Sequence, residues 1–152
     1  VQLLDPEIRL AISNPVTEKA SFNVYSAALC AFAENDGQSE RETNSYLLGA
    51  EVVKSQVIHH REIPQILASD EADASLIYYH LALRYTRIFP GHFDLIKLDI
   101  GQLPDPDRFV TTYHMALVVD GGPFGSKFAE FFRSPEFGEI YGRHGLQPHR
   151  ET

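Results

Sequence analysis

The chain has 152 residues, 43% of them hydrophobic, which suffices for one domain with a single core. The formal net charge of −8 argues against a nucleic-acid partner, because a phosphate-binding surface needs clustered Lys and Arg. The charge does not exclude a small anion, which a few local donors can hold. The single cysteine, Cys30, excludes an internal disulfide, and no apolar run reaches the ~20 residues of a membrane span.

In the first half of the chain, segments with the hydrophobic pattern of a strand alternate with segments that have the pattern of a helix. In order, it predicts a strand at Ile8–Ile12, a helix from about Phe22 to Glu34, a helix at Glu40–Leu48 and a strand at Glu51–Ile58. Ser21 stands directly before the first helix, and a serine in that place is a natural N-cap. Its hydroxyl and the amides of Phe22 and Asn23 would then point toward the same place.

The second half continues this alternation. In order, it predicts a helix at Arg61–Ser69, a strand at Ala74–Tyr79, a helix at Leu81–Phe89, and strands at Phe93–Leu98 and Val110–Val119 around the polar linker Gln102–Arg108. Pro64 is expected in the first turn of its helix, where a missing N–H costs nothing. Strands that alternate with helices of this length indicate an α/β fold in three layers, a parallel or mixed sheet between flanking helices.

The chain ends in a predicted pair of helices within Gly125–Leu146. Phe128, Phe131 and Phe132 recur at helical spacing before Ser134-Pro135. Serine followed by proline is typical of an N-cap and a first helical position, and Gly145 supplies the matching stop.

Two helix starts are candidate ligand sites, since ligands of α/β sheets collect where strands end and helices begin. The first is Ser21, whose alternative role is to cap its own helix. The second is His59-His60, because a helix N-terminus offers free N–H groups and about half a positive charge, which suits an anion. A metal held by the paired histidines, or plain surface histidines, are the alternatives at this place.

A strand end supplies the third candidate, Tyr78, which follows Leu76-Ile77. A phenolic hydroxyl there can donate to a bound oxyanion, and a plain core tyrosine is the alternative. No hydrolase signature, phosphate-cradling glycine loop or His-Glu-x-x-His motif is present, so we expect neither an enzyme nor a cofactor. Asp70 and Asp73 look like paired carboxylates but lie in a predicted turn.

Four segments together resemble a known family of transport receptors. They are Leu10–Pro15, Glu71–Tyr78, Tyr113–Val119 and Phe131–Leu146. In order and spacing they resemble the second half of a type II periplasmic solute-binding protein, most closely the molybdate-binding component of ABC transporters. The resemblance covers nearly the whole chain.

The resemblance implies a domain organisation, a location and partners. Residues 1–108 would be the second lobe of a two-lobe binding protein, and residues 109–152 the return strand and C-terminal helices that belong to the first lobe. The protein would be periplasmic, or membrane-associated and extracytoplasmic, and would pass a small oxyanion to an ABC transporter permease. A missing N-terminal lobe, or a second chain in a dimer, would cover the apolar side chains of the terminal helices.

The resemblance also implies three ligand contacts. These are a loop residue before the first helix, which falls on Ser21 with Ala20 as the neighbouring alternative, the amide of His60, and the strand-end Tyr78. Asn23 and His59 are secondary candidates for ligand contact. The family's usual Pro-Ala-Gly loop is replaced by Glu18–Ser21, so tungstate, sulfate or a small organic acid are alternatives to molybdate.

Two further hypotheses come from different classes of protein. The same lobe would serve as the ligand-sensing domain of a transcriptional regulator, fused to a helix-turn-helix. Alternatively, His59 and His60 would hold a metal in a metal-binding protein or a small metal-dependent enzyme. We expect no bound metal in the receptor reading.

Overall fold

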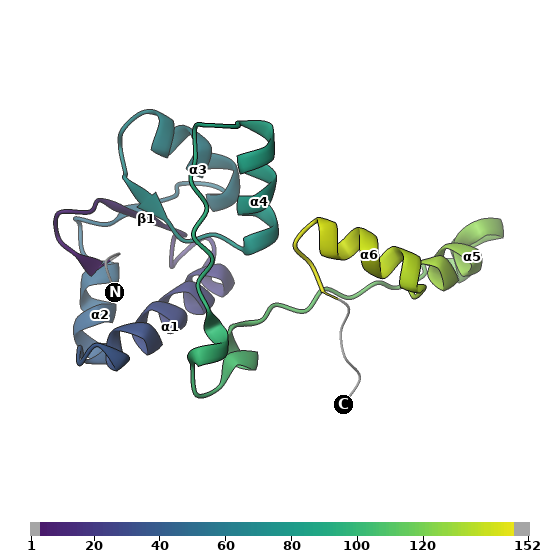
Figure 1. The fold of residues 1–152 in the computed structure, drawn as a ribbon, viewed down its shortest axis with the longest axis horizontal. Coiled ribbons are helices and arrows are strands. Elements are labelled where there is room, and N and C mark those ends of the chain that lie inside the picture. The colour runs from purple at the N-terminus through teal and green to yellow at the C-terminus, as the bar shows by residue number, and fades with distance from the viewer. Residues whose placement is uncertain (1–3, 148–152) are drawn as a thin grey trace.

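A parallel sheet lies among helices α1 to α4 in the structure, a computed structural model that describes residues 4–147 (Figure 1). Strand β1 (Leu10–Ile12) pairs on one side with β2 (Val53–Lys54) and on the other with β3 (Ala74–Ser75). Ala11 is the register partner of Val53 in one pair and of Ser75 in the other. The central strand is confirmed, but it begins at Leu10 rather than Ile8. The two edge strands are also shorter than predicted, because β1 offers them few residues to pair with.

Helices cover both faces of this sheet, and alternate residues of β1 divide between the two layers. Leu10 and Ile12 are fully buried in a core cluster with residues of helices α1 (Lys19–Asn35) and α2 (Glu40–Leu48). Ala11 points to the other face and packs with residues of α3 (His59–Ala68). Because β1 is buried on both faces, all three of its residues are apolar. The predicted three-layer α/β class is confirmed.

The start of α1 corrects one prediction. The helix begins at Lys19 rather than Phe22, and its N-cap is Glu18, so the assignment of Ser21 as N-cap is wrong. The first helical hydrogen bond runs from the amide of Phe22 to the carbonyl of Glu18, over 3.0 Å. The apolar pattern identifies Phe22 as the first buried residue of the helix, but the polar turn before it is already helical.

Helix α2 has the predicted bounds because its start is fixed locally. Ser39 is its N-cap, and the Ser39 and Glu42 side chains each accept from the other's backbone amide in a capping box. Helix α4 (Tyr79–Ile88) follows β3 and begins slightly before the predicted Leu81.

Pro64 lies in the body of α3, not in its first turn, because the helix already begins at His59. A proline there cannot donate to the carbonyl of His60, the residue one turn earlier. That carbonyl instead accepts a hydrogen bond from the hydroxyl of Tyr85 on α4. The two helices are therefore joined at the acceptor that the proline leaves free.

The predicted strands at 93–98 and 110–119 are wrong. The first segment is irregular and leads to the short helices η2 (Ile100–Gln102) and η3 (Pro106–Phe109), and the second is irregular up to η4 (Val119–Gly121). Residues 111–119 are all exposed. Their β-branched composition favours a strand, but strand propensity is expressed only where a neighbouring strand and a buried face are available.

The predicted terminal helices are confirmed as α5 (Gly122–Phe132) and α6 (Pro135–Arg143). The Ser134 hydroxyl accepts from the amide of Phe137 over 3.2 Å and caps α6, and Gly145 follows with a φ of +79°. Both helices lie at a distance from the sheet, at the end of the extended chain that leaves the lobe (Figure 1). Phe124 is 73% exposed and Phe128 is 51% exposed.

Candidate functional site

Polar residues gather where the strands end. Ser13 follows β1 and Ser55 follows β2, and both are buried, with exposed fractions of 0% and 1%. The Asn14 side-chain amide donates to the carbonyl of Ser55 over 3.1 Å, and its carbonyl oxygen accepts from the amide of Val16 over 2.8 Å. Asn14 thereby fixes the loop that leads into α1 against the loop that leads into α3. The starts of these two helices consequently lie at the same edge of the sheet.

Glu18 links the two helix starts. Its backbone caps α1, while its carboxylate oxygen Oε2 accepts from the amide of His59, the first residue of α3, over 2.6 Å. The same oxygen accepts from the hydroxyl of Ser55 over 3.2 Å. A negative charge is stabilised at helix N-termini because free N–H groups and the helix dipole both favour it. Glu18 therefore occupies the kind of position that a bound anion takes.

A second carboxylate covers the loop before α3. Glu62 accepts from the amides of Gln56, Val57 and Ile58 over 2.7, 2.6 and 2.6 Å. Partial desolvation acts to raise the pKa of Glu62, but these three amides outweigh it and hold that pKa below its usual range. The two carboxylates thus take four successive amides, and the amide of His60 is the next one, to which neither of them bonds.

His59 is a buried, neutral part of this edge. The residue is 1% exposed, and Nε2 lies 2.7 Å from the carbonyl oxygen of Leu76. Because a carbonyl only accepts, Nε2 must carry the hydrogen. Burial lowers the pKa of His59 and favours the neutral ring. Nδ1 has no hydrogen-bond partner among the described residues.

A metal site built on the paired histidines gains no support from this geometry. One ring nitrogen of His59 is already bonded to a backbone carbonyl. Within residues 4–147, no three side chains of His, Cys, Asp or Glu come close enough together to hold a metal ion. A structural metal site needs such a set of converging ligands.

A series of rings runs along the same edge. The ring of Tyr25 lies 5.7 Å from that of His59 and 5.2 Å from that of Tyr78, measured between centroids. Tyr78 in turn stacks on His80 with the centroids 6.1 Å apart, and the rings of His80 and Tyr113 form a T-shaped pair at 5.7 Å. Burial, with Tyr78 close by, raises the pKa of Tyr25, which keeps its hydroxyl protonated. The hydroxyl of Tyr25 is therefore a potential hydrogen-bond donor.

The predicted residues occupy related positions. Ser21 lies in the first turn of α1, one turn before Tyr25 on the same side of the helix, and Tyr25 contacts Tyr78. His60 is the second residue of α3 and half-buried. Joint contact of Ser21, His60 and Tyr78 with one ligand stays a prediction. Of the secondary candidates, Ala20 and Asn23 are exposed on α1, and His59 is buried against Leu76.

Three residues of this edge were missed by sequence reasoning. Glu18, Ser55 and Tyr25 carry its main polar and ring contacts. A local signal existed for Glu18, since an acidic residue in the loop before a helix suits the positive end of the helix dipole. No local signal relates Glu18 to α3, because that contact is set by the order of the strands.

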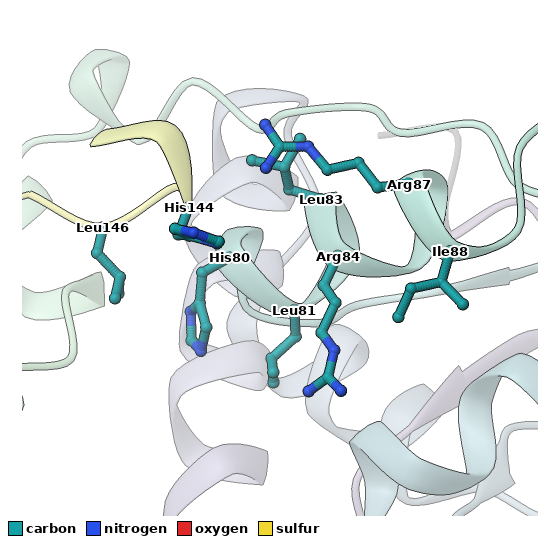
Figure 2. A pocket seen from close by; sticks show the side chains of 8 residues that line it. All are labelled: His80, Leu81, Leu83, Arg84, Arg87, Ile88, His144 and Leu146. Atoms are coloured by element: carbon teal, nitrogen blue, oxygen red, sulfur yellow. The ribbon is translucent and has the colours of Figure 1, made fainter. Parts of the chain in front are cut away.

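A cavity of about 490 Å³ lies along α4, beside this edge, and its lining includes His80, Arg84, Arg87 and His144. Figure 2 shows the Arg84 and Arg87 side chains extending to opposite sides of α4. The two guanidinium groups therefore do not converge on one anion. His80 connects the cavity with the ring series, because it also stacks on Tyr78.

Comparison with known proteins assigns the family. A family model described as bacterial extracellular solute-binding protein matches residues 1–147. The chain belongs to this family. No curated protein and no solved structure matches the chain. The extracellular character of these solute-binding proteins agrees with the extracytoplasmic location expected from the sequence.

As a member of the solute-binding proteins, the chain is a receptor that binds a small molecule and works with an ABC transporter. None of the helices within residues 4–147 combines the length and apolar character that a membrane span requires. The edge that holds Glu18, His59 and Tyr78 lies where this type of α/β fold collects its ligands, beyond the carboxyl ends of parallel strands.

Proposed function

We propose that this solute-binding protein is the receptor for a small oxyanion of the molybdate or tungstate type, which it presents to the permease of an ABC transporter. One observation carries the proposal: the starts of α1 and α3 are tied together at the carboxyl edge of the sheet, through Glu18 and Asn14. Two helix starts at one place supply unpaired amides and a favourable field for an anion.

The proposed contacts are donors. They are the hydroxyl of Ser21, the amide of His60 and the hydroxyl of Tyr78. Donors without acceptors suit a fully deprotonated dianion such as molybdate or sulfate. Phosphate near neutral pH keeps a proton, and that proton would face another donor and leave a polar group unpaired at a cost of ~1–3 kcal/mol.

We propose further that the chain divides between two lobes, with residues 1–108 in the second lobe and residues 109–152 returning to the first. The separation of α5 and α6 from the sheet supports this division, as does the exposure of Val118, Phe124 and Phe128, at 80, 73 and 51%. An apolar face of this kind is normally covered. In the proposed receptor the first lobe covers it, and hinge closure of the two lobes over the anion provides the affinity that one lobe lacks.

Isothermal titration of the full-length protein with molybdate, tungstate and sulfate tests the proposal. We expect heat of binding with at least one of these dianions, and at least tenfold weaker binding in Tyr78→Phe and Ser21→Ala. Tyr141→Phe is the matched control, because Tyr141 lies in α6, away from the sheet. Absence of heat with all three dianions would remove the proposed function.

A further inference from the structure

The carboxylate of Glu18 already makes the contacts that an anionic ligand would make. Its oxygen Oε2 accepts from the amide that begins α3 and from the hydroxyl of Ser55. Both donors belong to residues that are 1% exposed, so they are screened from solvent. Charge-assisted hydrogen bonds to buried donors are the strong ones. Glu18 also stands at the start of α1, so its charge lies at the positive ends of two helix dipoles.

A second observation at the same edge is a pair of buried polar atoms. The hydroxyl of Ser13, at the end of β1, and Nδ1 of His59 are both buried and have no hydrogen-bond partner among the described residues. Buried polar groups are nearly always paired with protein, water or a ligand. These two lie on residues directly next to the loops that Glu18 bridges, since Ser13 precedes Asn14 and His59 donates its amide to Glu18.

A dianion and the Glu18 carboxylate cannot share these donors. Each amide hydrogen serves one strong acceptor, and two like charges within hydrogen-bond distance of the same donor repel. The amides of the loop before α3 are not available to the ligand either, because all three that precede His59 donate to the carboxylate of Glu62. An oxyanion on the next amide, that of His60, would lie beside the Glu18 carboxylate, and repulsion between the two negative charges favours displacement of the Glu18 side chain.

We propose that Glu18 is the specificity-determining residue of this site, a carboxylate of the protein that occupies the place of the ligand's anionic group until the ligand binds. Oxyanion binding at the neighbouring amide of His60 is then opposed by the Glu18 charge until the Glu18 side chain leaves the amide of His59 and the hydroxyl of Ser55. This inference rests on the proposed function, because it concerns the same site. Displacing the Glu18 side chain costs free energy, so anions that bind weakly do not occupy the receptor.

The test compares three forms of the full-length protein by isothermal titration with sodium molybdate, tungstate and sulfate. Glu18→Ala removes the competing carboxylate, and we expect it to bind at least tenfold more tightly than the wild type. Glu18→Gln keeps an acceptor oxygen without the charge and should fall between the two. Glu40→Ala is the matched control, because it removes an acidic residue from the first turn of another helix, α2, and should leave affinity unchanged.

The outcomes separate this inference from the proposed function. If the wild type binds an oxyanion and Glu18→Ala binds it no more tightly, the role of Glu18 is wrong and the receptor function stands. If Glu18→Ala binds where the wild type does not, the role of Glu18 is supported and the wild-type receptor for these anions is excluded. If no form binds any of the three, both proposals fall. Circular dichroism establishes whether each variant is folded. If Glu18→Ala does not fold, the affinity of Glu18→Gln is compared with that of the wild type instead.

Discussion

The hydroxyl of Tyr85 donates to the backbone carbonyl of His60, the acceptor that Pro64 leaves without its helical partner. In an uninterrupted helix, the amide at position 64 would bond this carbonyl. A side chain from α4 takes its place, so the irregularity in α3 fixes α3 against α4. The bond also holds the residue whose amide is a proposed ligand contact.

Removing the Tyr85 hydroxyl should destabilise the protein. In Tyr85→Phe the carbonyl of His60 loses its donor, and we expect the free energy of unfolding to fall by about 1 kcal/mol. Urea unfolding followed by circular dichroism measures it. Pro64→Ala restores a backbone donor for the same carbonyl, so in that background the Tyr85→Phe cost should shrink toward zero. An equal cost in both backgrounds would show that the hydroxyl does not compensate for the proline.

Helices with strong local signals were predictable from the sequence, and unpaired strands were not. Ser39 with Glu42 and Ser134 with Pro135 fix the starts of α2 and α6 through bonds that span only a few residues. The segment from Val110 to Val119 has strand composition, yet no strand lies beside it in the described structure. A strand depends on a distant partner, and a single sequence does not say whether that partner is present.

The contact between Arg9 and Asp73 should make stability depend on acid pH. The Arg9 side chain and amide both donate to the Asp73 carboxylate, and these bonds lower the pKa of Asp73 from 3.8 to about 2. The folded state binds the proton more weakly than the unfolded state, so this stabilisation is present above about pH 4 and is lost as the pH falls toward about 2.

Asp73→Asn should therefore show a smaller loss of stability than the wild type between pH 4 and pH 2. Denaturant midpoints measured across that window give the comparison. The exposed Asp94→Asn is the matched control and should follow the wild type. If the denaturant midpoints of the wild type and Asp73→Asn fell in parallel with pH, the contact between Arg9 and Asp73 would not be the cause of the acid dependence.

The buried ring of His59 should make the stability of the protein depend on pH in a second, higher pH range. Burial lowers its pKa below the ordinary 6.5, so the unfolded state takes up the proton first. The stability that comes from the neutral ring is complete above about pH 6.5 and declines as the pH falls below it. His59→Gln keeps a donor for the Leu76 carbonyl and should flatten stability between pH 7.5 and 5.5. The exposed His92→Gln should retain the wild-type slope, and a slope that survives in His59→Gln would refute the explanation.

Gly145 should tolerate alanine less well than Gly37 does. Both have positive φ, +79° and +84°, so alanine strains the backbone similarly at each. A Cβ at Gly37 meets open space, whereas at Gly145 it would lie 2.9 Å from the Tyr79 ring and 3.1 Å from the backbone of His80. We expect Gly145→Ala to lower the free energy of unfolding by about 1 kcal/mol more than Gly37→Ala. Equal costs would mean that the end of α6 does not pack on the start of α4.

The candidate site was predictable in location but not in its internal contacts. Helix starts and a strand end pointed to Ser21, His60 and Tyr78, because such places are readable from hydrophobic period and turn residues. The bond from Glu18 to the amide of His59 joins two loops that are distant in sequence. It follows from the parallel order β2-β1-β3, which brings these loops together.

The most direct test of the receptor account is a nuclear magnetic resonance titration of the full-length, ¹⁵N-labelled protein with molybdate. We expect saturable shifts of the backbone amides of Ser21, His60 and Tyr78, with the amides of α2 unmoved. Saturable shifts confined to other parts of the molecule, with the amide of His60 unchanged, would contradict it.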